Sequence, residues 1–392
     1  MKNIVCLMFI MFSICTCRSN EKGTFGYDID FLSKHKKTIV LKNNNDKCQI
    51  AIVPDYQGRV MTSTSDGLNG KSYGWINYEL ISSNKFEKHI NVFGGEDRFW
   101  LGPEGGQYSI FFKEGDDFNI DNWYTPKAID TEPFSLVSHT DNRAVFNKQF
   151  GLTNYQGFEF EIEVLREISI LDKASIEKSL LIEIGDQVSY VGFESKNKIT
   201  NIGPLSWTKE NGLLSMWILG MFNPTSSTTV IIPYKDSLEL NTRYFGEIDS
   251  DRLRISEKNI LFKGDGKYRS KIGVPSKNAL SVLGSYDAEN KVLTIVQFSL
   301  SKENLYVNSL WEYQEKPYEG DVVNTYNDGP LDNGDQLGPF YELESSSAAK
   351  ELNQNEFIKH THKTFHFEGE LEDLNGIAEK ILNTDLSKIQ IF

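Results

Sequence analysis

Apolar and polar residues alternate along many stretches of this chain, as they do on strands that bury only one face. Residues 158–164 alternate apolar and acidic side chains over seven positions, and residues 291–300 are rich in β-branched and aromatic residues. Both patterns predict β-strands. Turn-forming pairs such as Asp66-Gly67 and Asn333-Gly334 recur between such stretches. Short strands between frequent turns predict an all-β fold, a large antiparallel sandwich.

Helical periodicity stands out in two stretches. Residues 370–382 place Leu371, Leu374 and Leu382 on one face, which predicts an amphipathic helix near the C-terminus. Residues 346–353 are a shorter helix candidate. No repeat of fixed period runs along the chain, which argues against propellers and solenoids. We therefore expect a large antiparallel sandwich with few short helices.

The composition is that of a folded globular protein, with 12% aromatic and 24% charged residues. The 392 residues exceed the usual domain length of about 100–200 residues, although large β folds often run longer as one unit. Since no linker rich in Ser or Pro interrupts the body, we expect residues 25–392 to form a single domain. The formal charge of −14 repels phosphate groups, which argues against a nucleic-acid partner.

The N-terminus has the pattern of a targeting segment. Lys2 precedes an apolar stretch at residues 4–14, which is too short to span a bilayer as a mature helix. The sequence Ile14-Cys15-Thr16-Cys17 resembles a bacterial lipobox. We therefore expect residues 1–16 to be a signal peptide, Cys17 to carry a lipid anchor, and residues 17–24 to be a tether. The protein would then lie in the bacterial cell envelope, periplasmic or outer-membrane facing; an ordinary secretory signal is the alternative.

Residues 94–112 hold the densest set of chemically active side chains. They interleave glycines with the carboxylates of Glu96, Asp97 and Glu104, the guanidinium of Arg98 and the indole of Trp100. The glycines predict a shaped loop rather than a regular element. Carboxylate and guanidinium groups hydrogen-bond hydroxyls, and an indole packs on a sugar ring, so the segment suggests one wall of a glycan pocket. The alternative is a surface turn with solvated acids and a Trp100 that fills a core.

Three histidines follow one another near the C-terminus. On a strand, His360, His362 and His366 share one face, while Phe365 and Phe367 lie on the other. Imidazole titrates near neutral pH and suits general acid or base work. A half-buried strand with its polar side in solvent explains the same pattern without a function. The spacing alone is weak support for a metal site, and we expect none.

Amides, acids and aromatic rings mix in residues 323–344. Asn327 and Asp328 are of the types that recognise hydroxyl groups, although turn chemistry explains them without a ligand. Glu342 follows Phe340 and Tyr341, and an acid among aromatic rings loses solvation and gains pKa. We therefore take Glu342 as a candidate base.

Several common catalytic motifs are missing from the sequence. It has no P-loop, no dinucleotide-binding fingerprint, no G-x-S-x-G elbow and no zinc-protease helix motif. Nucleotide, flavin and serine-hydrolase chemistry are therefore disfavoured. We expect no cofactor.

Taken together, these stretches resemble an uncharacterised family of secreted bacterial lipoproteins related to the galactose-mutarotase-like superfamily. The resemblance implies a β-supersandwich with sugar bound on the concave face of a large antiparallel sheet. Aldose epimerases of that superfamily use a His as general acid and a Glu as general base, so by likeness a histidine of the row 360–366, with Glu342 or Glu104, would take these roles. The epimerases' central histidine motif is absent here. The matching stretches are residues 58–61, 89–107, 324–330 and 338–347 and the histidine row.

Two functions of different classes follow. The first is a carbohydrate-active lipoprotein with acid/base chemistry on a sugar, of epimerase, hydrolase or lyase type, with Glu104, Glu342 and His362 as catalytic groups. The second is a glycan-binding lipoprotein without catalysis. For both functions we expect a carbohydrate ligand and one pocket in which all the candidate side chains converge. The expected substrate-binding residues are Glu96, Asp97, Arg98, Trp100, Asn327, Asp328, His360 and His366.

Overall fold

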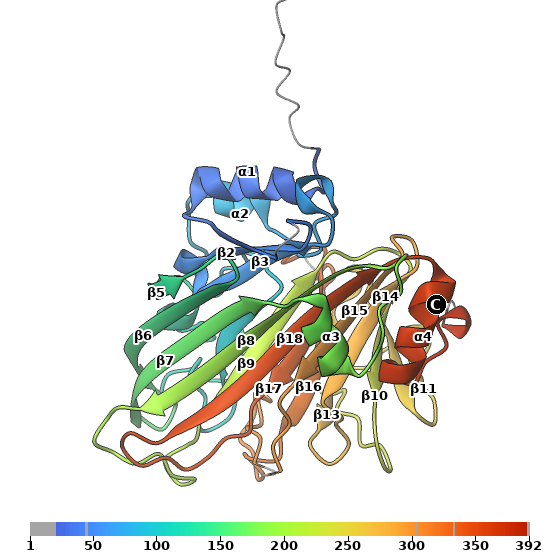
Figure 1. Cartoon of the computed structure of the whole chain (residues 1–392). Helices are drawn as coiled ribbons and strands as arrows, with labels where there is room; N and C mark the ends of the chain where they lie inside the picture. The colour runs from blue at the N-terminus through green and yellow to red at the C-terminus, as the bar shows by residue number, and fades with distance from the viewer. Residues whose placement is uncertain (1–20, 44–45, 303–304, 332–333, 390–392) are drawn as a thin grey trace, which may run out of the picture.

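The computed structural model describes residues 21–43, 46–302, 305–331 and 334–389, and in these residues the strands form three antiparallel sheets (Figure 1). The prediction of a large antiparallel β fold with few short helices is confirmed. The expected signal peptide and Cys17 lie outside the described residues, as does most of the expected tether.

The largest sheet has ten strands and forms the face seen in Figure 1. The two stretches predicted from alternation, residues 158–164 and 291–300, both contribute strands to it. In spatial order the strands are β11 (Leu253–Ile255), β12 (Asn259–Lys263), β10 (Thr228–Pro233), β14 (Val282–Asp287), β15 (Val292–Phe298), β18 (Phe357–Glu368), β8 (Ser189–Asn201), β7 (Glu159–Ile170), β6 (Arg143–Thr153) and β5 (Ser135–His139).

A five-stranded sheet packs behind the large one. Apolar side chains from both sheets, such as Val230 and Val296 on one side and Ile272 and Leu343 on the other, form one buried cluster between them. This packing defines the core of the sandwich. In spatial order the strands are β13 (Ser270–Pro275), β16 (Asp321–Asn327), β17 (Tyr341–Ser346), β9 (Ser215–Phe222) and β4 (Arg98–Gly102).

The N-terminal part of the chain forms a separate layer above one end of the sandwich (Figure 1). It contains β1 (Ile39–Lys42), β2 (Gln49–Val53) and β3 (Arg59–Thr64), covered by α1 (Phe25–His35) and α2 (Tyr78–Ser83). Helix α1 begins at Thr24, whose hydroxyl accepts a hydrogen bond from Tyr27 N. Phe25 and Leu32 pack its inner side against Ala51 and Met61.

Two further helices cover the face of the large sheet that points away from the small one. They are α3 (Lys173–Leu180) and α4 (Leu371–Leu382), whose apolar residues cluster with Phe365 and Phe367. Helix α4 confirms the amphipathic helix predicted near the C-terminus. None of the helices in the described residues is long and apolar enough to cross a membrane.

The short helix predicted at residues 346–353 is wrong. Ser346 ends strand β17, and other segments accept hydrogen bonds from the following backbone N–H groups: Ser347 N donates to Met216 O and Leu352 N to Trp207 O. Tertiary hydrogen bonds hold this stretch extended, and they outweigh its weak helical propensity.

The five-stranded sheet has two faces, and they organise the rest of the molecule. We call the face that packs on the ten-stranded sheet the inner face and the opposite one the outer face. Side chains alternate between the two faces along each strand. On β17, Tyr341, Leu343 and Ser345 are on the inner face, while Glu342 and Glu344 are on the outer face.

Candidate functional site

Two rows of side chains cross the outer face. The strand register puts Lys271, Tyr326, Glu342 and Met221 side by side, and the next row holds Gly273, Asn324, Glu344, Leu219 and Arg98. Directly paired residues of adjacent strands point to the same face. Three of these five strands, β13, β17 and β4, thus bring a lysine, two glutamates and an arginine together from distant parts of the sequence.

Lys271 and Glu344 form the centre of this outer-face cluster. Lys271 Nζ lies 3.2 Å from Glu344 Oε2, which also accepts a hydrogen bond of 2.8 Å from Trp217 Nε1. The lysine Nζ lies 4.6 Å from the centre of the Trp217 ring. Both charged side chains are buried. Burial opposes the charge of Lys271, but Glu344, Glu104 and Glu342 together raise its pKa.

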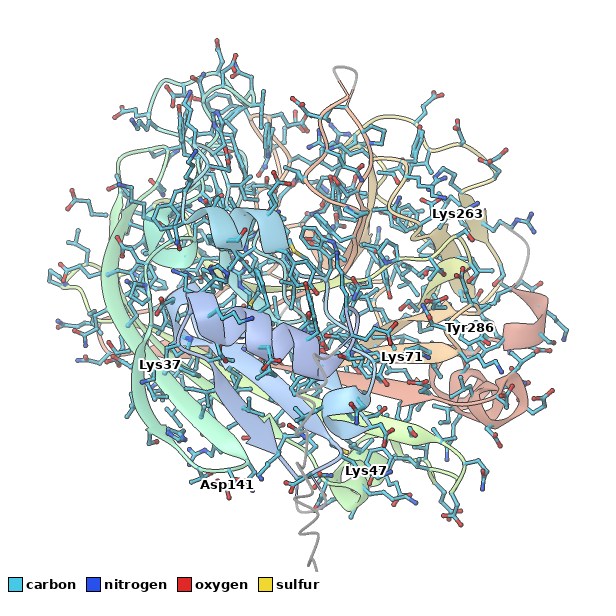
Figure 2. The ribbon with its side chains drawn as sticks, turned by 90° about the horizontal axis from the view of Figure 1, so that it is seen from above. Lys37, Lys47, Lys71, Asp141, Lys263 and Tyr286 are labelled. Atoms are coloured by element: carbon cyan, nitrogen blue, oxygen red, sulfur yellow. The ribbon has the colours of Figure 1, made fainter. Side chains whose placement is uncertain are left out.

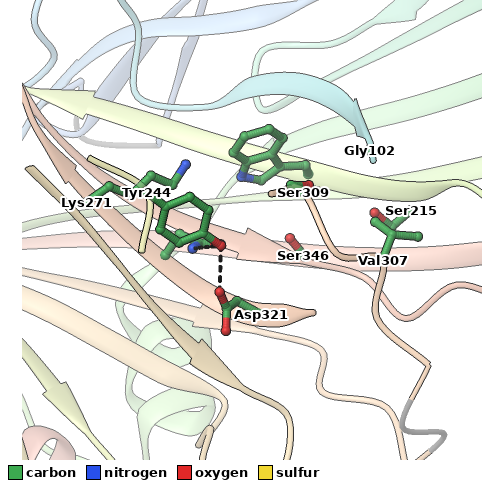
Figure 3. Close-up of a pocket in the computed structure, with 10 residues that line it drawn as sticks. Gly102, Ser215, Tyr244, Lys271, Val307, Ser309, Asp321 and Ser346 are labelled. Carbon is green, nitrogen blue, oxygen red and sulfur yellow. Dashed lines mark hydrogen bonds between the residues drawn. The ribbon is translucent and has the colours of Figure 1, made fainter. Parts of the chain in front are cut away.

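Tyr244 covers the cluster (Figure 3). Its ring centre lies 5.3 Å from Lys271 Nζ, and its hydroxyl donates a hydrogen bond of 2.6 Å to Asp321 Oδ2. Asn324 Nδ2 donates to the same hydroxyl at 3.2 Å. Beside these side chains lies a cavity of about 10 Å³, bounded by Ser309 and Ser346 among others, which is room for about one water molecule.

Two further carboxyl groups of the cluster have raised pKa values. Burial, and then the charge of Glu344, raises the pKa of Glu342 well above its ordinary range, although Lys271 and Arg98 act against this. Burial also raises the pKa of Glu104 to about 7, against the charge of Lys271. A carboxyl group with a raised pKa holds its proton to a higher pH than an ordinary glutamate, which suits it to proton transfer.

Arg98 and Trp100 lie at the edge of the outer face, on β4. Arg98 Nη2 lies 2.9 Å from Asp130 Oδ1, and its guanidinium stacks 4.1 Å from the centre of the Trp100 ring. Trp100 is buried against Trp123 and Trp217. The shaped loop expected over residues 94–112 is therefore wrong in part, because Arg98–Gly102 is a strand. The structure supports the alternative interpretation, in which Trp100 fills a core.

A second polar cluster lies on the inner face, between the two sheets. His366 Nε2 lies 2.8 Å from Glu96 Oε2, while its Nδ1 and Thr294 Oγ1 are hydrogen-bonded at 2.9 Å. Because a carboxylate only accepts, Nε2 donates to Glu96 and Nδ1 then accepts from Thr294 in the neutral ring. The imidazole is thus fixed on both sides.

The next polar pair of the inner face is Asp97 with Arg166. The two are hydrogen-bonded, both side chains are fully buried, and Arg166 Nη1 donates a further hydrogen bond of 2.7 Å to Asn197 Oδ1. Glu96 and Asp97 are thus buried and not solvated, contrary to the surface-turn alternative.

His360 and His362 meet at one hydroxyl group. Ser345 Oγ lies 2.8 Å from His360 Nε2 and 2.8 Å from His362 Nδ1, so it donates to one ring and accepts from the other. Burial lowers the pKa of His360 to about 3 and that of His362 to about 4. Both rings are therefore neutral at physiological pH, and they join the two sheets through Ser345.

The expectation that all candidate residues converge on one floor is wrong. Arg98, Glu104 and Glu342 belong to the outer face, whereas His360, His362, His366, Glu96 and Asp97 lie between the sheets. The reason is the two-residue period of a strand, which turns neighbours such as Asp97 and Arg98 to opposite sides. His362 and Glu342 therefore do not face a common ligand.

Asn327 and Asp328 organise the turn that follows β16. Asn327 Oδ1 accepts from Gly266 N at 2.8 Å, and its Nδ2 donates to Tyr268 O at 2.9 Å. Asp328 Oδ2 accepts from Gly338 N at 2.9 Å. These contacts satisfy backbone groups, which agrees with the turn interpretation of this stretch.

A family model of a family of unknown function, DUF6786, matches residues 23–392. The chain belongs to this family. No curated protein is similar enough to count as a relative. The antiparallel sandwich fold is shared with solved structures of other proteins.

Two solved structures share the fold over most of this chain. The Slr1438 protein of Synechocystis sp. PCC 6803 is 13% identical, with a TM-score of 0.51 over 86% of this chain and 96% of that protein. An aldose 1-epimerase-type protein of Escherichia coli K12 is 10% identical, with a TM-score of 0.50 over 85% of this chain and 99% of that protein. At this identity the likeness concerns the fold alone.

The outer-face cluster contains residues that the sequence analysis did not single out. They are Lys271, Glu344, Tyr244 and Asp321. The two-residue spacing of Glu342 and Glu344 on one strand was a usable signal, because it puts both carboxyl groups on one face. Nothing local pointed to Lys271, which reaches the cluster through strand pairing.

The described residues contain no group of three His, Cys, Asp or Glu side chains placed to hold a metal ion together. The outer-face cluster itself offers three kinds of chemical group. These are carboxyl groups that hold or release protons, two cations that stabilise negative charge, and indole surfaces.

Proposed function

We propose that the DUF6786 chain is a carbohydrate-active protein that works by acid/base chemistry at its outer-face cluster. The observation that carries the proposal is the gathering of three carboxyl groups, Glu104, Glu342 and Glu344, around Lys271 beside buried indoles. The galactose mutarotase-like fold, shared with an aldose 1-epimerase-type protein, supports a sugar-related role by analogy.

The protonation states suit a reaction at the anomeric centre of a sugar. Glu342 and Glu104 have raised pKa values, so each holds its proton to a higher pH than an ordinary glutamate, which suits them to donate a proton to a sugar oxygen. Glu344, paired with Lys271, is the group that accepts a proton from a hydroxyl. Protonating the ring oxygen while deprotonating the anomeric hydroxyl breaks the ring C–O bond and gives the open-chain aldehyde; the reverse step closes it. His362 lies on the other face and is left out of this site.

Access to the cluster requires Tyr244 to move. Its ring and its bond to Asp321 stand over Lys271, and the cavity beside them holds about one water molecule. Sugar binding would therefore break the hydrogen bond between Tyr244 and Asp321. The second candidate, a glycan-binding protein without catalysis, would need the same movement of Tyr244.

The experiment measures binding and turnover separately. Thermal unfolding of the purified full-length chain with a panel of monosaccharides identifies a ligand, because a molecule that binds only the folded state raises the melting temperature. Polarimetry with freshly dissolved α-D-glucose and α-D-galactose then measures mutarotation. Glu342→Gln and Glu104→Gln should lower the rate at least tenfold while sugar binding persists.

Glu96→Gln is the matched control, because it changes a buried glutamate on the inner face and leaves the outer face intact. A panel without any binding sugar overturns the proposal. Binding that persists in every variant without turnover supports the glycan-binding candidate instead.

We also propose that the protein is a lipoprotein, anchored through Cys17 in the bacterial cell envelope on the periplasmic or outer-membrane side. The support is the sequence of residues 1–24 alone. Labelling cells with a radioactive fatty acid and comparing the wild-type chain with Cys17→Ser tests it: incorporation should disappear in the variant, whereas Cys15→Ser should keep it.

A further inference from the structure

A second cavity, of about 350 Å³, lies where the N-terminal layer meets the end of the ten-stranded sheet. Small-molecule sites span about 300–1,000 Å³. One wall comes from residues 22–28 and 71–78, and the other from β14, β15 and the ends of neighbouring strands. Lys71 lies at this boundary in Figure 2, between α1 and the strands of the sandwich. None of the residues that line this second cavity belongs to the outer-face cluster.

Aromatic rings form the floor of this cavity. Tyr73 stacks on His366 with 4.3 Å between ring centres and 18° between planes, and Phe222 meets the same imidazole edge-on at 5.7 Å. Tyr341 lies next to Phe222, at 5.6 Å. The faces of such rings attract cations and apolar C–H groups.

Carboxylates supply the charge of the cavity walls. Asp28 is buried and accepts hydrogen bonds from the hydroxyls of Ser72 and Tyr78. A carboxylate has about four acceptor positions, so Asp28 keeps capacity for a further donor. Burial raises its pKa to about 6, which leaves it mostly ionised at neutral pH. Asp287 adds a second carboxylate from the opposite wall.

The two lysines of the cavity differ in how they are engaged. Lys71 Nζ lies 2.7 Å from Glu368 Oε1 and donates to Asn290 O at 2.9 Å, so its charge is neutralised locally. Lys22 instead places Nζ 5.2 Å from the centre of the Tyr78 ring, near Asp28. The exposed ammonium group of Lys22 thus lies near both an aromatic ring and a buried carboxylate.

We propose that this cavity binds a small ligand that carries a primary ammonium group, which displaces Lys22 and pairs with Asp28 while its C–H surface packs on Tyr73 and Tyr78. The carboxylates of the wall would bind the ammonium group of such a ligand, and the aromatic rings of the floor would pack against its C–H groups. The site is independent of the sugar chemistry proposed for the outer face.

The test uses cyclohexylamine, which is charged at pH 7.5, and cyclohexanol, which has the same ring without the charge. Calorimetric titration and thermal unfolding of the full-length chain should show binding of the amine and at least tenfold weaker binding of the alcohol. Equal effects of the two probes, or no binding of the amine, overturn the proposal.

Three variants assign the binding to this cavity. Asp28→Asn keeps the shape and removes the charge, and it should weaken amine binding by about ten- to a hundredfold. Lys22→Met removes the competing ammonium group from an exposed position, and it should strengthen amine binding by about two- to fivefold. Glu342→Gln, on the outer face, should leave amine binding unchanged. Unchanged or weaker binding in Lys22→Met overturns the proposal even if Asp28→Asn fails to fold.

Discussion

Lys271 Nζ lies 3.2 Å from Glu344 Oε2, and both groups are buried on strands that are separated in the sheet only by β16. The pair joins two distant parts of the chain. The lysine also lies in the field of the carboxyl groups of Glu104 and Glu342. The electrostatics of the proposed site depend on this contact.

Removing one partner of this pair should therefore destabilise the protein. Lys271→Met leaves Glu344 buried without a cation, and we expect the free energy of unfolding to fall by about 3–5 kcal/mol. The double variant Lys271→Met/Glu344→Leu should recover part of the loss, because neither charge remains. Urea unfolding of the two single variants and the double variant measures this coupling; strictly additive losses would contradict it.

The pair between Arg166 and Asp97 should matter far more than an exposed pair of the same chemistry. Arg166→Met leaves Asp97 buried and unpaired, which costs about 3–5 kcal/mol. Arg143→Met is the matched control, since Arg143 is exposed and pairs with Glu167 at the surface, where the loss of stability should be small. Similar unfolding midpoints for the two variants would show that the inner-face pair does not hold the sheets together.

Glu104 gives the protein a dependence on pH with a defined sign. Its pKa is raised from 4.5 to about 7 in the folded state, so the folded chain holds a proton that the unfolded chain has lost. This contribution is complete below pH 4.5 and disappears as the pH rises through 7. The stability of the wild type relative to Glu104→Gln should therefore fall between these values and then level off. A flat difference over this range would contradict the raised pKa.

His360 should make the stability of the protein change with pH in the opposite direction, at acid pH. Its pKa is lowered from 6.5 to about 3, so below pH 6.5 the unfolded chain takes up a proton that the folded chain refuses. The stability of the wild type relative to His360→Gln should decrease steadily as the pH falls from 6.5 toward 3. Chemical unfolding at intervals of half a pH unit measures the difference, and an increase toward acid pH would contradict the buried, neutral ring.

The sequence by itself determined the type and position of several elements. The strict alternation of residues 158–164 could only bury one face as a strand, and the apolar spacing of residues 370–382 required a helix, since both patterns follow from local periodicity. The raised pKa of Glu342 was also predicted, because this acid follows two aromatic residues in the sequence and such an acid loses solvation.

The tertiary structure alone decided which of these side chains meet. Lys271 reaches Glu344 only because β13, β16 and β17 pair in one register, and this register depends on contacts between residues far apart in the chain. The same pairing turns the histidine row inward against Ser345 and leaves Glu342 on the outer face. The two-residue period of a strand determines that neighbouring side chains point to opposite faces of the sheet. Only the packing of the two sheets determines which face is buried in the core.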